Sequence, residues 1–221
     1  NIATLAIQGP KSEYVMKKVF GNNISKLKFF SYDYFKFNGV LYMISKSGFS
    51  KQGGYEIYIE NIKSGLMLYD ELMKEGKESN IKPGCPNTIE RIEGALLSYG
   101  NDMDNNDNPF ECGFDKYICL DNGIDYLGKK ALKNIKKQGI EKKLMGVKID
   151  LNVINLTKEE KLLDDKENVI GHLRSAAFSP KFKKVVGIAM IKSKYCNDLQ
   201  KFKVNIDDKY SSGIVCNLPM L

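Results

Sequence analysis

The sequence predicts an α+β protein in two parts, with antiparallel sheets and helices over residues 1–140 and a small C-terminal β-barrel over residues 141–221. Two observations support this prediction. Strand and helix signals alternate in the first part, whereas short strands separated by turn residues fill the second. A hinge-like tract at residues 139–143 follows the last helix signal and marks the predicted boundary.

The first 60 residues carry the signals of a strand, a helix and a hairpin followed by another strand. Gly9-Pro10 closes the first strand, and Asn38-Gly39 is the strongest short hairpin signal. The predicted elements are a strand at 1–8, a helix at about 11–20 and strands at 29–37, 40–45 and 55–60.

The strand after the hairpin raises the main functional question. Side chains alternate across a strand, so the face that carries Glu56 and Tyr58 is opposite to the face that carries Tyr55, Ile57 and Ile59. We expect the apolar face to be buried. The other face then presents a carboxylate and a phenol to a ligand.

Helices are predicted on both sides of a proline-containing loop. Residues 61–77 place apolar side chains at helical spacing, and Pro86 suits the first turn of the next helix, at 87–98. On that second helix Arg91 shares a stripe with a glycine and a serine, which leaves room for a bound group. A short basic helix at 126–138 completes the first part.

The acidic loop at residues 102–108 has the composition of a calcium loop but lacks its pattern. Against the EF-hand template it has Asp107 where glycine is needed and Gly113 where the bidentate glutamate belongs. The five cysteines are scattered without a C-x-x-C pair, and the chain has one histidine. We therefore expect neither a metal site nor a disulfide framework.

Beyond residue 140 the sequence changes to short strands of even spacing. This arrangement is typical of a small antiparallel barrel or sandwich. The predicted strands are 144–150, 169–175, 185–192, 202–206 and 213–218.

Composition limits the classes of partner. A hydrophobic fraction of 43%, no run of about 18 apolar residues and no signal-peptide pattern predict a cytoplasmic protein without a membrane partner. The net charge is +7, but the lysines are spread over the whole length rather than gathered on one element, so we expect no nucleic-acid partner.

The two arginines stand out in this lysine-rich chain. Arginine occurs only at Arg91 and Arg174, so 32 of the 34 basic residues are lysine. The guanidinium group is a planar fork suited to carboxylates and flat ligands. For either arginine a structural ion pair and a role in ligand binding remain open.

Several motifs in order along the chain resemble those of the glycine-cleavage T-protein family. KSGFSKQGGYEIY (residues 46–58) is similar to the family's Arg-Thr-Gly-Tyr-Thr-Gly-Glu-Asp-Gly-Phe-Glu-Ile, and RIEGALLSYGNDMD (91–104) to its Arg-Leu-Glu-Ala-Gly-Leu-x-Leu-Tyr-Gly-Asn-Asp. The resemblance spans the whole chain. Shorter matches are Gln8-Gly9-Pro10, Pro109 with Glu111 and Gly113, Ser179-Pro180 and Leu218-Pro219.

The resemblance implies a folate-binding domain followed by a C-terminal β-barrel, with tetrahydrofolate as cofactor. The family's N-terminal segment, which carries an acidic residue near the reacting nitrogen, has no counterpart here. The chain is thus expected to be the C-terminal part of such a protein, with that missing segment as a partner and a homodimer left open. No catalytic residue is assigned within the chain.

Two variant stretches, NPFECGFDKY (108–117) and GHLRSAAFSP (171–180), resemble the dimethylsulfoniopropionate demethylase branch of the family. The implied reaction transfers a methyl group from a small sulfonium substrate to N5 of tetrahydrofolate. The alternatives are aminomethyl transfer in the glycine cleavage system and a non-catalytic folate-binding module. The module's Lys-Gly-Cys-Tyr-x-Gly-Gln signature is missing here.

The candidate site residues follow from chemistry and resemblance together. A carboxylate accepts two adjacent donors at once, which suits Glu56 to the edge of a reduced pterin, with Tyr58 against the ring. The alternative for Glu56 is a solvent-facing residue on an edge strand. The resemblance adds Arg91 and Tyr99 to the cofactor site, and Phe178 and Arg174 are candidates for substrate binding. Aromatic side chains attract a sulfonium cation, and Tyr32 and Tyr34 are further candidates for the walls of the site.

Overall fold

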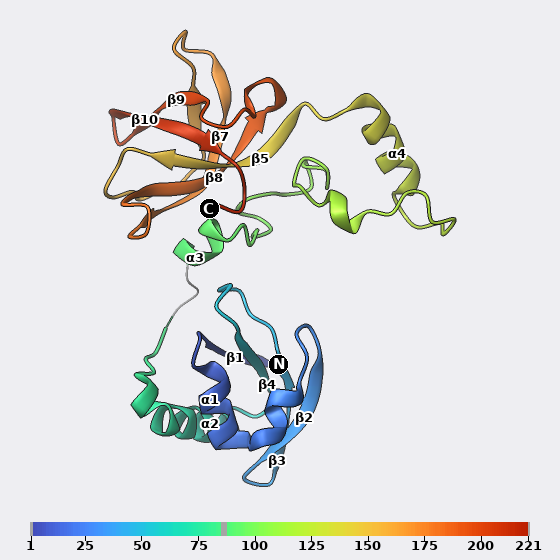
Figure 1. Cartoon of the computed structure of the whole chain (residues 1–221), viewed down its shortest axis with the longest axis vertical. Coiled ribbons are helices and arrows are strands. Elements are labelled where there is room, and N and C mark those ends of the chain that lie inside the picture. The colour runs from blue at the N-terminus through green and yellow to red at the C-terminus, as the bar shows by residue number, and fades with distance from the viewer. Residues whose placement is uncertain (1, 85–87, 221) are drawn as a thin grey trace. The chain divides into compact units, whose positions relative to one another are not determined.

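The computed structural model describes residues 2–84 and 88–220. The chain divides into two compact units, residues 1–87 and 88–221 (Figure 1). The predicted helix start at Pro86 lies outside the described residues. Within the described ranges, none of the helices is both long and apolar enough to pass through a membrane.

The first unit is a four-stranded antiparallel sheet with two helices packed on one of its faces. The strand order is β1-β4-β3-β2. The β2–β3 hairpin turns at Asn38 and Gly39, whose φ angles of 46° and 81° are those that the predicted two-residue turn requires. The elements are β1 (Ala3–Gln8), α1 (Ser12–Phe20), η1 (Asn22–Lys26), β2 (Tyr32–Phe37), β3 (Val40–Ser45), β4 (Gly54–Ile59), α2 (Ile62–Glu75) and η2 (Lys77–Ser79).

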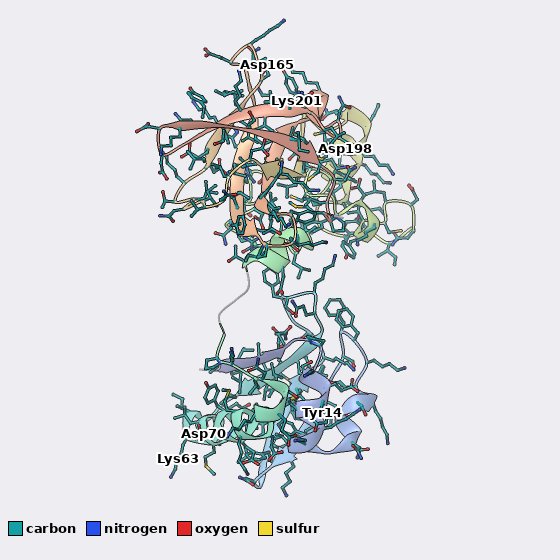
Figure 2. The ribbon with its side chains drawn as sticks, turned by 60° about the vertical axis from the view of Figure 1, so that its left-hand side comes forward. Tyr14, Lys63, Asp70, Asp165, Asp198 and Lys201 are labelled. Atoms are coloured by element: carbon teal, nitrogen blue, oxygen red, sulfur yellow. The ribbon has the colours of Figure 1, made fainter. Side chains whose placement is uncertain are left out.

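The core of the first unit lies between the helices and the sheet. Val15 and Met16 of α1 and Leu68 of α2 are buried with Ile44 and Ile57 of the sheet in one apolar cluster. The opposite faces of the helices are exposed, as Figure 2 shows for the labelled side chains Tyr14, Lys63 and Asp70. The helices therefore cover one face of the sheet, and the other face carries the candidate site.

The second unit contains the predicted barrel, which closes in the order β10-β5-β8-β7-β6-β9. Its interior is a buried apolar cluster that includes Val147, Leu173 and Val204. The sequence predicted five of the six strands and missed β6, a four-residue strand. The strands are β5 (Lys142–Ile149), β6 (Glu160–Leu163), β7 (Val169–Ser179), β8 (Lys184–Lys192), β9 (Lys201–Ile206) and β10 (Lys209–Cys216), with η4 (Ser193–Tyr195) between β8 and β9.

Residues 88–141 belong to the same compact unit as the barrel. Ile92 and Cys112 are buried in a cluster with barrel residues such as Ile188, and Met220 donates its N–H to the carbonyl of Glu93. The predicted domain boundary near residue 140 falls within this unit and stays a prediction. The elements here are α3 (Thr88–Glu93), η3 (Asp115–Tyr117) and α4 (Lys129–Gln138).

The predicted helix at 87–98 is wrong in its length, because α3 ends at Glu93. Ala95 has a φ of 56°, in the left-handed region that an α-helix cannot use. The N–H of Ser98 bonds to the side chain of Asp102 instead of continuing a helical ladder. The predicted stripe of Arg91 with the following glycine and serine is therefore absent from this stretch.

Candidate functional site

The candidate site lies on the outer face of β4, in the first unit. Tyr55, Ile57 and Ile59 are buried at 1%, 0% and 7% exposure, whereas Glu56 and Tyr58 are half-buried on the opposite face. This confirms the predicted alternation of faces. β4 pairs with β1 on one side and β3 on the other, so it is a central strand and not an edge strand.

Neighbouring strands add polar and aromatic side chains to the same face. Across the sheet, Glu56 pairs with Ala6 of β1 and with Ser45 of β3, and Ser45 in turn pairs with Tyr32 of β2. Cross-strand partners lie about 4.5–5.5 Å apart on one face of a sheet. Glu56 is therefore part of a transverse row that ends at an exposed tyrosine.

A second row runs parallel to the first. Tyr58 pairs with Thr4 and Met43, and Met43 pairs with Tyr34. The exposed rings of Tyr32 and Tyr34 meet edge to face with centroids 6.3 Å apart. The sheet thus brings together the two predicted pterin-binding residues and two of the predicted aromatic wall residues.

The loop before β4 supplies a hydroxyl to Glu56. Ser47 Oγ donates a hydrogen bond to Glu56 Oε2, and the Oγ atoms of Ser45 and Ser47 lie 2.6 Å apart. Within the part of the chain that the structure describes, no hydrogen bond to Glu56 Oε1 occurs. Sequence reasoning missed both serines, because Ser45 lies beside Glu56 through the register of the β3–β4 pair and Ser47 reaches it through the path of the loop, and strand periodicity shows neither.

Gln8 fixes that path. Its Nε2 donates to the carbonyls of Ser47 at 3.1 Å and Tyr55 at 3.4 Å, and Ser50 Oγ donates to its Oε1 at 2.8 Å. A Cβ added to Gly48 would lie 1.9 Å from Gln8 Oε1, so the loop backbone approaches the amide as closely as only glycine allows. The Gln8-Gly9-Pro10 motif singled out from the sequence therefore serves to hold the loop.

The start of the loop is tied to α1 by an ion-pair network. Glu13 lies 2.9 Å from both Lys17 and Lys46, and Tyr55 donates its hydroxyl to Glu13 at 3.3 Å. The hydrogen bonds from Lys17 and then from Lys46 lower the pKa of Glu13 to about 2. Burial raises the pKa of Tyr55, which keeps its phenol a donor.

Arg91, in the second unit, forms a buried ion pair. Its Nη1 lies 2.6 Å from Asp102 Oδ2, and its Nη2 donates to Ser175 Oγ at 2.9 Å. Ser175 Oγ donates to the other oxygen of Asp102 at 2.5 Å. This is the structural alternative that the sequence left open. A role of Arg91 in folate binding stays a prediction.

Arg174 also forms ion pairs and hydrogen bonds, mainly with the acidic loop at residues 102–108. It contacts both oxygens of Asp107, lies 3.0 Å from Glu159 through Nε and donates to the carbonyl of Asp102 at 2.8 Å. Burial raises the pKa of Asp107, but hydrogen bonds from Arg174 and Lys142 outweigh it and bring the pKa to about 2. The acidic loop is thus fastened to the barrel.

The two remaining candidates, Tyr99 and Phe178, also lie in the second unit and contact different neighbours. Tyr99 is exposed and donates its hydroxyl to Asn105 at 2.8 Å, whereas Phe178 is half-buried against the barrel core. His172 is half-buried on β7 opposite Lys161 and Met190. Among the described residues, no group of three or more potential ligands could hold a metal ion.

Two family models match the chain. Residues 1–122 match the GCVT N-terminal domain, and residues 142–221 match the glycine cleavage T-protein C-terminal barrel domain. The aminomethyltransferase T of the glycine cleavage system from Bartonella henselae has a similar fold, with a TM-score of 0.86 at 20% identity over 100% of this chain and 60% of that one.

Two curated relatives are more similar in sequence. The dimethylsulfoniopropionate demethylase DmdA of Ruegeria pomeroyi is 39% identical over 86% of this chain and 52% of its own length. An aminomethyltransferase of Caldanaerobacter subterraneus is 34% identical over 97% of this chain and 57% of its own length. The chain therefore spans little more than half the length of the curated relatives it matches.

Proposed function

Because the chain belongs to the glycine cleavage T-protein family, we propose that it takes part in tetrahydrofolate-dependent one-carbon transfer. We propose that the reaction is the demethylation of dimethylsulfoniopropionate, with transfer of the methyl group to N5 of tetrahydrofolate. The 39% identity to the Ruegeria pomeroyi demethylase supports this choice. The observation that carries the proposal is the position of Glu56 on the open face of β4.

The carboxylate of Glu56 fits the edge of a reduced pterin. The pterin presents an exocyclic amine beside a ring N–H, and a carboxylate has about four lone-pair sites with which to accept both donors. Ser47 uses one site on Oε2, which leaves sites on both oxygens. Tyr58 lies two residues further on the same face, and we propose that it packs against the ring.

Methyl transfer from a sulfonium needs no general acid, because the leaving group is a neutral thioether. When bound, tetrahydrofolate would supply the nucleophilic N5; the electron pair of the broken C–S bond would stay on sulfur, a neutral thioether would leave, and the proton of N5 would pass to water. The residues of this chain then bind and orient the two reactants at near-attack distance. The faces of Tyr32 and Tyr34 attract a sulfonium cation on the same side of the sheet.

The chain covers 52% and 57% of the lengths of these two relatives, so part of the active site can lie outside the chain. The family resemblance places an acidic residue in a segment N-terminal to these residues. We propose that such a segment completes the site as a partner of this chain. Under this proposal Glu56 and Tyr58 bind the pterin, and the N-terminal segment and this chain together surround the reacting nitrogen.

Aminomethyl transfer from a lipoyl carrier protein is the second candidate function. The 34% identity to the Caldanaerobacter subterraneus aminomethyltransferase, over 97% of this chain, favours it. The two candidates share the folate contacts and differ in the donor. They separate in an assay of the protein with tetrahydrofolate and each donor in turn, with mass-spectrometric detection of the folate product.

The demethylase proposal expects 5-methyltetrahydrofolate and the thioether from dimethylsulfoniopropionate, and no product from the aminomethylated carrier. The reverse pattern would establish the aminomethyltransferase. When the N-terminal segment is also present, folate binding without turnover of either donor would favour the non-catalytic module.

A further inference from the structure

We propose that Ser47 is a positioning residue for Glu56, and that Ser45 sets the direction of its hydroxyl. The inference rests on the proposed function for the identity of the ligand. Its observations are the hydrogen bond from Ser47 to Glu56 Oε2 and the 2.6 Å separation of the two serine Oγ atoms.

The direction of both hydrogen bonds follows from counting protons. A serine hydroxyl has one proton to donate and two lone pairs with which to accept. Ser47 gives its proton to Glu56, so in its contact with Ser45 it must accept. Ser45 therefore donates to Ser47, and the chain of hydroxyls points toward the carboxylate. Hydrogen bonds in such a chain polarise and strengthen one another.

The side chain of Ser47 is not what holds the loop. Gln8 binds the carbonyl of Ser47, and Gly9 donates its N–H to the carbonyl of Gly53 at 2.9 Å. Ser50 provides the loop's side-chain contact with Gln8. Removal of the Ser47 hydroxyl leaves these three contacts in place. What is lost is the restraint on the Glu56 carboxylate, whose terminal torsion is otherwise broad.

The restraint matters because recognition of two adjacent donors depends on the plane of the carboxylate. With Oε2 fixed by Ser47, the remaining lone pairs of Glu56 point in a defined direction along the open face. A carboxylate that rotates freely must lose this freedom when the ligand binds, which weakens binding. Ser47 therefore acts on the ligand through Glu56 and does not touch it.

The test is a double-mutant cycle on tetrahydrofolate binding with Ser47→Ala and Glu56→Gln. We expect Ser47→Ala to weaken binding about tenfold, the effect of losing a charge-assisted hydrogen bond. In the Glu56→Gln background the same change should have little further effect, because the two residues act as a unit. Ser47→Thr keeps the hydroxyl and should bind within about twofold of the unmodified chain.

The matched control is Ser25→Ala, which removes a 2.6 Å bond from a serine hydroxyl to a backbone carbonyl in η1 of the same unit. It should leave binding unchanged. Thermal unfolding of each variant confirms that it is folded. The proposal is overturned if Ser47→Ala binds as the unmodified chain does, or loses as much affinity in the Glu56→Gln background as alone.

Failure of the proposed function gives a different result. If the unmodified chain does not bind tetrahydrofolate, the folate assignment fails. Crystal structures of the unmodified chain and of Ser47→Ala without ligand then test whether Ser47 positions Glu56. A Glu56 carboxylate that is ordered in the unmodified chain and turned or disordered in Ser47→Ala supports positioning. An unchanged carboxylate overturns it.

Discussion

Glu56→Gln is the substitution that tests the candidate site most sharply. The change keeps the length and shape of the side chain and replaces one carboxylate oxygen by an NH₂ group. Glu56 has Ser47 as its hydrogen-bond donor on Oε2 and offers Oε1 to a ligand. A glutamine can accept one donor through its remaining oxygen, while its NH₂ group faces either Ser47 or the second donor of the pterin.

The cost follows from one donor left without an acceptor. Loss of a hydrogen bond to a charged group, with a donor left unsatisfied, costs about 1–3 kcal/mol, which corresponds to a dissociation constant raised about five- to 150-fold. The assay is calorimetric titration of tetrahydrofolate into the protein under reducing conditions. Thermal unfolding of the variant shows whether the fold is retained.

Glu60→Gln is the matched control, because Glu60 is exposed and directly follows the end of β4. It makes the same chemical change nearby and should leave the dissociation constant within about twofold. Glu56 does not bind the pterin if Glu56→Gln binds tetrahydrofolate as tightly as the unmodified chain, or if both variants lose affinity equally.

Three further predictions concern stability. The pKa of Glu13 is lowered from 4.5 to about 2, so its contribution to the free energy of unfolding is complete above about pH 4.5 and is lost as the pH falls toward 2. Glu13→Gln should therefore flatten this part of the stability–pH profile, which urea unfolding measures. Asp107→Asn leaves the guanidinium of Arg174 without its buried anion and should cost the second unit about 3–5 kcal/mol in denaturant unfolding. Gly171→Ala places a Cβ 2.4 Å from the backbone oxygen of Met190 and should lower the stability of the barrel by about 1–3 kcal/mol; a variant as stable as the unmodified chain would contradict the packing described.

The sequence predicted those parts of the fold that depend on neighbouring residues alone, such as a tight turn. The Asn38-Gly39 turn formed as expected, because its residues tolerate the positive φ angles of a two-residue hairpin. β6 was missed because Glu160–Leu163 is short and does not alternate apolar with polar residues. The helix at Arg91 was predicted too long, since Ala95 adopts a left-handed conformation and the N–H of Ser98 bonds to the side chain of Asp102.

The same distinction holds for the candidate site. The face of Glu56 and Tyr58 follows from the two-residue period of a strand, which the sequence displays directly. The contact of Ser47 with Glu56 does not, because Gln8 holds the loop from a position 39 residues earlier in the chain. Arg174 was notable for its rarity, but Asp107, the acid that engages it, lies 67 residues away and comes close only in the folded unit.

In the proposed function, Glu56 binds the edge of a reduced pterin on the open face of β4. A crystal structure of the protein with tetrahydrofolate tests it most directly. We expect the pterin's exocyclic amine and ring N–H to lie within hydrogen-bond distance of the Glu56 carboxylate, with Ser47 still bonded to Oε2. A pterin bound elsewhere, or a Glu56 carboxylate paired with a lysine while the ligand is present, would contradict it.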